Sequence, residues 1–282
     1  MNRYIDCIIA CNRHDLTGFR PFFIAGERLG WVRVGVAEKL ATLPHLFETS
    51  ANGVSLAARH KDFASRSAAF AEAVLYLKES GVIRNMRDEF YPVLTKWGAP
   101  PLAQLDRGAA ACFGLPAFGL HVNGYVRKAD GIHMWLGRRA ADRIVEPNKL
   151  DNMVAGGHPI GISLMDNLVK ESKEEASLSK EIASRAVPVG IITYKREVPH
   201  GLQVDTIFNY DLELPADVTP VNHDGEVGKF TLVPLAEAAA LTRQPDAFKF
   251  NCGSVIIDFL IRHGFITPDE PDYLDIITAL HQ

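Results

Sequence analysis

Residues 155–179, AGGHPIGISLMDNLVKESKEEASLS, constrain the fold more than any other stretch of this 282-residue chain. Gly156 and Gly157, followed by Gly161, predict a loop in which the backbone can approach a ligand closely. Apolar and small residues then recur at helical spacing, which predicts a helix over residues 164–178. The stretch is therefore predicted as a glycine loop that leads directly into a helix.

The predicted helix carries three acidic residues, Glu171, Glu174 and Glu175, beside one another on one face. Offsets of three and four residues place their Cβ atoms about 5–6 Å apart, and like charges at this spacing cost a few tenths of a kcal/mol. A solvated face balanced by Lys170 and Lys173 is one explanation. Carboxylates at this spacing also suit Mg²⁺ or Mn²⁺, and the glycine loop beside them favours this metal site.

A segment rich in glycine and proline, KWGAPPLAQLDRG at residues 96–108, interrupts the pattern of elements. We place a domain boundary shortly after it, which gives an N-terminal α+β domain at residues 1–115 and a second domain at 116–282. Strands are predicted before, between and after the helices of the second domain, which indicates a mixed sheet with helices packed on it.

Short strands flanking turns are predicted around Gly26, at residues 129–131 and at 199–201, with a further strand at 90–97 and another at 229–235. Helices are predicted over residues 37–43, 65–80, 235–242 and 252–263, and two of them end at a glycine, Gly81 and Gly264.

The composition is that of an ordinary globular protein, and the net charge of −4 implies no bulk attraction to nucleic acid or to an anionic membrane. No apolar run approaches the roughly 18–20 residues that a membrane span needs. Four cysteines do not make a disulfide framework, so we expect a reducing, cytoplasmic location. Cys7, Cys11 and His14 lack a second ligand pair, which favours buried thiols over a zinc site.

The stretch that begins at Gly156 resembles the Nudix box, the loop–helix–loop signature of the Nudix hydrolases. Lys170 stands at the position of the arginine in that box, and Glu171, Glu174 and Glu175 match its three core glutamates. Ile162 falls where the first glutamate of the box would be. The resemblance implies an α/β/α sandwich with a mixed sheet, preceded here by a small α+β domain.

Nearly the whole chain resembles one Nudix subfamily, related to thiamine pyrophosphokinase-fused enzymes of fungi and to plant chloroplast homologues. FRPFFIAGERLGWV, GVIRNMRDEFYPV and AACFGLPAFGLHVNGYV are similar to its N-terminal accessory domain, of the DUF4743 type. AFKFNCGSVIIDFLIRHGFI is similar to its last stretch. The altered box, with lysine for arginine and no first glutamate, is usual in this subfamily.

The resemblance implies hydrolysis of a small organic diphosphate with one to three Mg²⁺ (or Mn²⁺) ions as cofactor. The residues that it implies for the metal are Glu171, Glu174, Glu175 and the Gly157 carbonyl, with Lys170 orienting a glutamate and Glu226 as a further ligand or base. For the substrate they are Gly156, Gly157, Arg138 and Arg139, with Trp135 as a stacking platform or a core residue. Asp151 and Asn152 are interpreted as a turn rather than as catalytic residues.

Several functions remain open at this point. The subfamily is linked to damaged thiamine diphosphates, such as oxothiamine and oxythiamine diphosphate, and 8-oxo-dGDP or another nucleoside diphosphate is the alternative substrate. A prenyl diphosphate isomerase would need a cysteine that faces a glutamate, and neither Cys112 nor Cys252 has a convincing context. A catalytically silent binding module is the third hypothesis. Arg20, Arg66 and Arg87 are candidates for reaching the cleft from the N-terminal domain, and a homodimer is possible.

Overall fold

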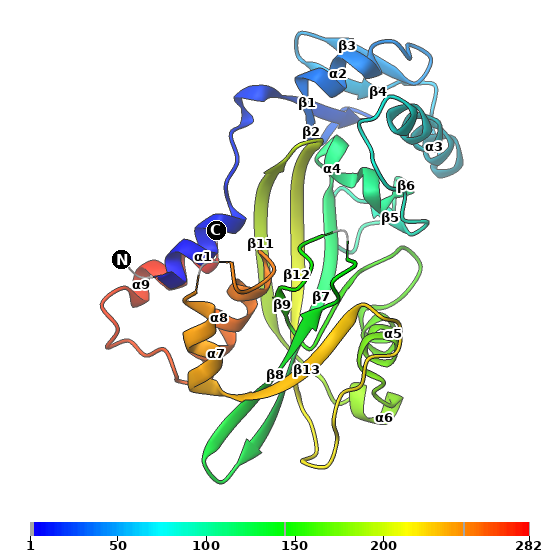
Figure 1. The fold of residues 1–282 in the computed structure, drawn as a ribbon. Coiled ribbons are helices and arrows are strands. Elements are labelled where there is room, and N and C mark those ends of the chain that lie inside the picture. The colour runs from blue at the N-terminus through cyan, green and yellow to red at the C-terminus, as the bar shows by residue number, and fades with distance from the viewer. Residues whose placement is uncertain (1–2, 144, 245, 282) are drawn as a thin grey trace.

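A seven-stranded mixed sheet forms the centre of the C-terminal half of the chain (Figure 1). The structure is a computed structural model that describes residues 3–143, 145–244 and 246–281. The main path of the sheet has the order β11(Val187–Val198), β12(Gly201–Glu213), β7(Pro116–Lys128), β8(Gly131–Arg139) and β13(Val227–Pro234). The short strands β10(Val154–Gly157) and β9(Leu150–Asp151) pair with β7 and β8. β12 runs parallel to β7, and the other pairs are antiparallel.

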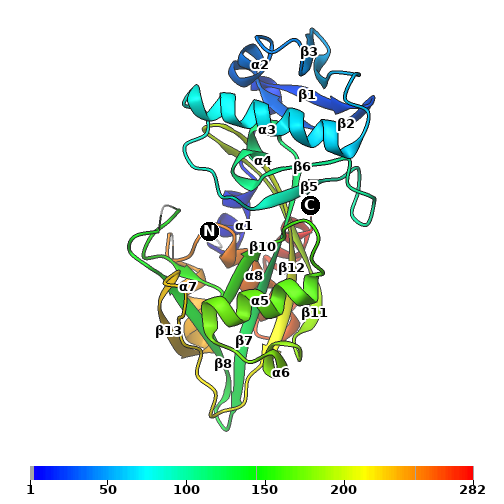
Figure 2. The ribbon, with the colours of Figure 1, turned by 90° about the vertical axis from the view of Figure 1, so that its right-hand side faces the viewer.

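Helices cover both faces of this sheet, as Figure 2 shows. α5(Leu164–Ala176) and α6(Lys180–Ala183) lie on one face, and α7(Leu235–Thr242), α8(Cys252–Arg262) and α9(Tyr273–Leu280) on the other. The side chains of β8 explain this division, because Met134 and Leu136 enter the core with α8 while Trp135 enters the core with α5. Alternate residues of a strand point to opposite faces, so a strand buried on both faces is almost continuously apolar.

The N-terminal half has a core of its own. Its four-stranded sheet has the order β2(Glu27–Arg33), β1(Phe19–Ile24), β4(Gly53–Leu56) and β3(Phe47–Ser50), with α2(Val34–Leu40) and α3(Phe63–Glu79) against it. A second, two-stranded sheet contains β5(Phe90–Val93) and β6(Ala103–Asp106), and α4(Ala110–Phe113) follows it after a short 3₁₀ turn. Four phenylalanine rings, 5.1–6.3 Å apart, pack together in this core: Phe22, Phe47, Phe70 and Phe113.

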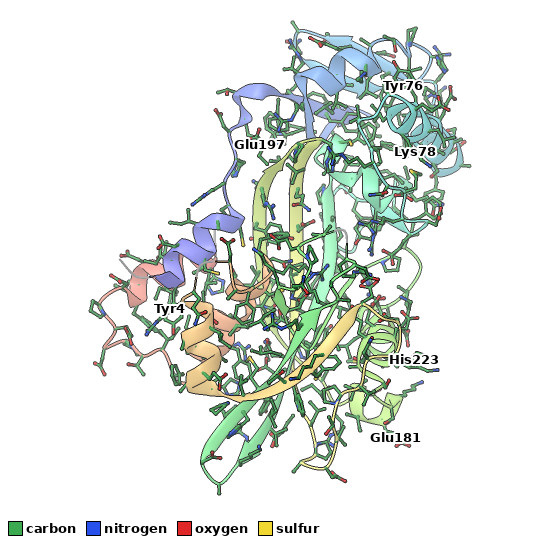
Figure 3. All side chains as sticks on the ribbon, viewed as in Figure 1. Tyr4, Tyr76, Lys78, Glu181, Glu197 and His223 are labelled. Atoms are coloured by element: carbon green, nitrogen blue, oxygen red, sulfur yellow. The ribbon has the colours of Figure 1, made fainter. Side chains whose placement is uncertain are left out.

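The first helix, α1(Arg3–Cys11), packs against the C-terminal helices and not against the N-terminal sheet. Tyr4, which Figure 3 labels, and Ile8 are buried in one core cluster with α8 and α9. The Cys7 Sγ atom occupies the space that a Cβ on Gly253 would take, so α1 and α8 approach each other closely there. The division of the chain at residue 115 stays a prediction, since this first helix packs with the other half.

The two halves meet at the end of the β11–β12 hairpin. Glu197, labelled in Figure 3, accepts a hydrogen bond of 2.6 Å from the Arg33 guanidinium at the end of β2. A Cβ on Gly201 would overlap the carbonyl of Ala111 in α4, so only glycine permits this contact. The N-terminal half therefore lies directly over one end of the central sheet.

The structure confirms the predicted α+β class and the mixed sheet between helix layers. It also confirms the predicted hairpins, the glutamate helix and the helices that became α3, α7 and α8. The strand predicted at residues 90–97 ends early, at Val93, and β3, β4, β6, β9, α4, α6 and α9 were not predicted from the sequence. Among the described residues, no helix combines the length and apolar character that crossing a bilayer requires.

Candidate active site

A cavity of about 660 Å³ opens between the glycine loop, α5, the loop before β13 and part of the N-terminal half. All four glutamates singled out from the sequence line it: Glu171, Glu174, Glu175 and Glu226. Lys170, Arg139, Gly156 and Gly157 line it as well. The structure thus brings most of the predicted site residues into one space.

The glycine loop reaches the glutamate helix because β10 adds Ala155, Gly156 and Gly157 to the edge of β7. A Cβ on Gly156 would lie 2.5 Å from Cδ of Glu171, and a Cβ on Gly157 would overlap the Tyr91 hydroxyl. Both glycines are therefore required by close packing, one against α5 and one against β5. The Gly157 carbonyl accepts a hydrogen bond of 2.7 Å from Asn167 Nδ2, which leaves its second lone pair for another partner.

The glutamate helix has a clear start and end. The Ser163 hydroxyl caps the first turn by accepting a 3.1 Å hydrogen bond from the Asp166 amide. Ser177 ends the helix in the left-handed conformation with φ +53°, a conformation that glycine adopts more easily. Leu168, Ser172 and Ala176 are buried beneath the helix as predicted, so the glutamates of the adjoining face are directed toward the cavity.

Glu171 and Glu175 are buried carboxylates, whereas half of the Glu174 side chain is exposed. Burial raises the pKa of Glu175 well above its usual range, the Ala155 amide 2.9 Å away lowers it in part, and the nearby Glu171 raises it further. Burial likewise raises the pKa of Glu171, although Lys170 opposes this shift. The positive charge that the protein places beside these two buried carboxylates does not offset the cost of burying them, so the pKa of each stays raised.

Lys170 supplies the only positive charge that contacts the helix carboxylates within the described part of the chain. Its Nζ atom lies 2.9 Å from Glu171 Oε1 and 3.2 Å from Glu174 Oε2. The Glu175 carboxylate has no such ion pair among the described residues and accepts only the Ala155 amide. A divalent cation fits this donor set, because carboxylate and carbonyl oxygens are the ligands of hard cations and the added charge would offset the burial of Glu175.

Among three further predicted residues, Glu226 lines the cavity, whereas Arg138 and Trp135 do not. Glu226 lines the cavity and its Oε2 lies 2.6 Å from Arg143 Nη2. Arg138 does not line the cavity and donates instead to the Asn148 carbonyl at 2.7 Å. Trp135 is buried in the core under α5, so core packing, and not stacking on a heterocycle, describes its position.

Asp151 and Asn152 form a buried polar network next to the cavity, which is more than the turn expected of them. The Asp151 carboxylate contacts Arg139 Nη1 at 2.9 Å and Lys249 Nζ at 3.5 Å, and it accepts a hydrogen bond from the Cys252 thiol at 2.7 Å. Burial alone would raise the pKa of Asp151, but the neighbouring cations lower it to about 2. Arg139, predicted as a substrate contact, is thus already paired.

His121, Asp151 and Cys252 bring potential metal-ligating atoms within 4.8 Å of one another. The Asp151 carboxylate in this cluster is already neutralised by two cations, so the helix glutamates are the better site for an added positive charge. Neither Cys112 nor Cys252 lines the cavity that the glutamates line, which gives no support to a cysteine-dependent isomerase.

The N-terminal half contributes part of the cavity wall, namely Arg87, Glu89, Tyr91 and Arg107. The Phe90 carbonyl accepts a hydrogen bond of 2.9 Å from the Ile160 amide, so β5 lies directly along the glycine loop. Of the three arginines considered from the sequence, only Arg87 reaches the cavity; Arg20 and Arg66 bond to nearby backbone carbonyls. Glu89, Tyr91 and Arg107 carry no local sequence signal for this role, because the contact depends on how the halves pack.

Comparison with known proteins gives a family for both halves. Residues 3–117 match a family model described as a domain of unknown function, DUF4743. The chain is 40% identical over 281 residues to Nudix hydrolase 24, chloroplastic, of Arabidopsis thaliana, and the matched region covers 98% of this chain and 77% of that protein. It is 39% identical over 288 residues to Nudix hydrolase 20, chloroplastic, of the same plant, with the same coverage.

A solved MutT/nudix family protein from Enterococcus faecalis overlaps more weakly, at 16% identity and a TM-score of 0.42, over 57% of this chain and 67% of that one. The two curated relatives carry the assignment, because their similarity extends through the accessory half, the glycine loop and the glutamate helix alike. This chain belongs to the Nudix hydrolase family and is a pyrophosphohydrolase of that family.

Proposed function

We propose that this enzyme uses Mg²⁺ to cleave the diphosphate of a small organic diphosphate, releasing a monophosphate and phosphate. The burial of Glu171 and Glu175 at the wall of the cavity, beside the glycine loop, carries this proposal. Damaged thiamine diphosphates, such as oxothiamine and oxythiamine diphosphate, are the substrates that the resemblance of the whole chain favours. 8-oxo-dGDP or another nucleoside diphosphate is the second candidate.

The residues of the glycine loop and of α5 have separate proposed roles. Glu171, Glu174, Glu175 and the Gly157 carbonyl would hold Mg²⁺, and Mn²⁺ would fit the same oxygen ligands. When bound, the metal offsets the charge of the diphosphate and lowers the pKa of water, the chemistry on which phosphoryl transfer depends. Lys170 keeps Glu171 and Glu174 oriented through its two contacts, as a point charge without the fork of an arginine.

Glu226 is the proposed general base. It reaches the cavity from the loop before β13, and Arg143 fixes one of its oxygens. The backbone of this loop is held to α5, because the Glu174 carbonyl accepts a hydrogen bond of 3.2 Å from the Asp224 amide. A base on this loop is therefore positioned relative to the glutamate helix.

Replacing Glu226 with glutamine should lower kcat by about 10²-fold or more, since a positioned general base contributes on this order. The KM for the diphosphate should change little, because the metal and phosphate contacts remain. The measurement is steady-state kinetics at saturating Mg²⁺ with Asp217→Asn, which does not line the cavity, as the control. A kcat equal to that of the control would remove Glu226 from the mechanism.

The substrate is tested with a panel of diphosphates in Mg²⁺: thiamine, oxothiamine and oxythiamine diphosphate, 8-oxo-dGDP, ADP-ribose and isopentenyl diphosphate. Release of phosphate and of the monophosphate is measured. Ile162→Ala should retain most activity, because the box glutamate is already absent there, whereas Glu175→Gln should lose it. No turnover on any compound would contradict the proposed function for these substrates and would favour a catalytically silent binding module.

A small diphosphate is the proposed partner, without nucleic acid or membrane. The cytoplasmic location and the homodimer stay predictions, and the names of the two plant relatives place those proteins in the chloroplast.

A further inference from the structure

A second cavity, of about 820 Å³, lies between the N-terminal half and the end of the β11–β12 hairpin. Several residues line both this cavity and the catalytic one, namely Arg87, Tyr91, Arg107, Val145, Gln203 and Asp205. The two cavities therefore adjoin along a shared wall, which we call the junction. The far side of the second cavity is formed by α2, α4 and residues 81–85.

Arg87 differs from the other cationic side chains of the catalytic cavity. Arg107, Arg139, Arg143, Lys170 and Lys249 each contact a carboxylate: Glu89, Asp151, Glu226, Glu171 and Asp151 respectively. Within residues 3–143, 145–244 and 246–281, the Arg87 guanidinium makes no such ion pair. It is thus the lining cation whose charge is available to an anionic ligand.

The backbone of Arg87 is held in place by Asp106, a carboxylate that is only 3% exposed. Asp106 accepts hydrogen bonds of 3.0 Å from the Arg87 amide, 2.9 Å from the Asp88 amide and 2.8 Å from the Gly108 amide. Asp88 adopts φ +54°, a conformation that costs energy in a residue other than glycine and is maintained here by these bonds. The Arg87 side chain thus leaves a fixed backbone toward the junction.

We propose that Arg87 binds the diphosphate of the substrate at the junction and that the second cavity holds the organic group. The N-terminal half would then complete the substrate site of the Nudix half. This inference rests on the proposed function. The role of Arg87 follows from its charge, since a charge-assisted hydrogen bond to phosphate is stronger than a neutral one. The place of the organic group follows from the second cavity, which adjoins Arg87 at the junction.

Arg87→Ala should raise the KM for the organic diphosphate about ten-fold or more, as the loss of a charged hydrogen bond predicts, with little change in kcat. Arg87→Lys should recover part of the affinity, because a lysine keeps the charge without the bidentate fork. Arg59→Ala is the matched control, since Arg59 is exposed in the same half and lines neither cavity. A KM for Arg87→Ala equal to that of Arg59→Ala would overturn the proposal.

Binding of inorganic pyrophosphate, measured by calorimetry in Mg²⁺, separates this proposal from the proposed function. Arg87→Ala should weaken pyrophosphate binding about ten-fold relative to Arg59→Ala. This comparison does not depend on turnover, so it decides the role of Arg87 even if no compound of the panel is hydrolysed. Equal pyrophosphate affinities of the two variants would exclude Arg87 as a phosphate ligand. The melting temperature of both variants should match that of the wild type, because the Arg87 guanidinium pairs with no carboxylate of the residues that the structure describes.

The second cavity is tested by filling it. Gly35 in α2 lines only this cavity, and a Cβ there would meet nothing within 4 Å. Gly35→Phe should therefore fold and should weaken binding of the organic diphosphate several-fold, while pyrophosphate, which lacks the organic group, binds as to the wild type. Equal binding of the organic diphosphate to Gly35→Phe and to the wild type would place its organic group elsewhere.

Discussion

Replacing Glu175 with glutamine should lower kcat/KM for the organic diphosphate by at least about 10²-fold, the order of loss on removing one charged group that stabilises a transition state. The same change should raise the melting temperature of the metal-free protein by a few °C, because it removes a buried negative charge that contacts no cation among the described residues. Loss of activity together with a gain in stability is the mark of a site built for a bound cation.

The gain in stability should depend on pH. Burial raises the pKa of Glu175 above its unfolded value, so the neutral carboxyl is favoured in the folded protein and ionisation costs stability as the pH rises through the raised pKa. The difference in melting temperature between Glu175→Gln and the wild type should therefore be large at about pH 8 and small below the unfolded pKa of about 4.3. Saturating Mg²⁺ should reverse it, because metal binding stabilises the wild type alone.

Glu181→Gln is the matched control for this pair of measurements. Glu181 lies on α6, is exposed and does not line the cavity, so its replacement should change neither activity nor melting temperature. Figure 3 labels it on the short helix below α5. A Glu175→Gln enzyme that keeps wild-type turnover would contradict the assignment of the metal site.

Replacing Asp151 with asparagine should lower the free energy of unfolding by about 3–5 kcal/mol, the usual result of leaving a buried charge without its partner. Arg139 and Lys249 would both lose their carboxylate, and their side chains are only 11% and 16% exposed. At this size of protein the melting temperature should fall by roughly 10 °C. Urea unfolding and calorimetry both measure the change.

The contribution of Asp151 should be lost in acid. Its pKa is lowered to about 2 in the folded protein, so it adds stability above its unfolded pKa of about 3.9 and loses that contribution as the pH falls toward 2. The wild type and Asp151→Asn should therefore converge in stability over this acidic window. Asp246→Asn is the control, because Asp246 contacts Lys149 but is 89% exposed. Equal unfolding free energies for these two variants at neutral pH would show that Asp151 is not structural.

Local pattern was sufficient for the elements that carry the metal ligands. Glu171, Glu174 and Glu175 are three and four residues apart, so any helix over this stretch places them together, and the apolar spacing beneath them requires such a helix. The turns of the hairpins were likewise visible in short runs of glycine and proline. The helix α9 was missed although it has an apolar face and follows an aspartate, Asp272, because it is only eight residues long.

Residues that meet only through packing were not predictable in this way. Arg139 and Trp135 lie four residues apart on β8 and therefore on the same face by strand alternation, yet Arg139 lines the cavity whereas Trp135 is buried in the core with α5. Alternation predicts the face of a strand residue, but it does not predict which part of that face other elements cover. Asp151 was interpreted as part of a turn because its partners Lys249 and Cys252 are about one hundred residues away in the chain.

The sequence by itself determined the glycine loop, the glutamate helix and the family, because these depend on residues that are neighbours along the chain. Only the tertiary structure decided that Arg87, Glu89 and Arg107 face those glutamates. That decision rests on the close contacts of Gly157 with Tyr91 and of Gly201 with Ala111, which hold the N-terminal half over the cavity. Contacts between distant segments depend on shape and burial in the folded protein, and the spacing of residues along the chain does not predict them.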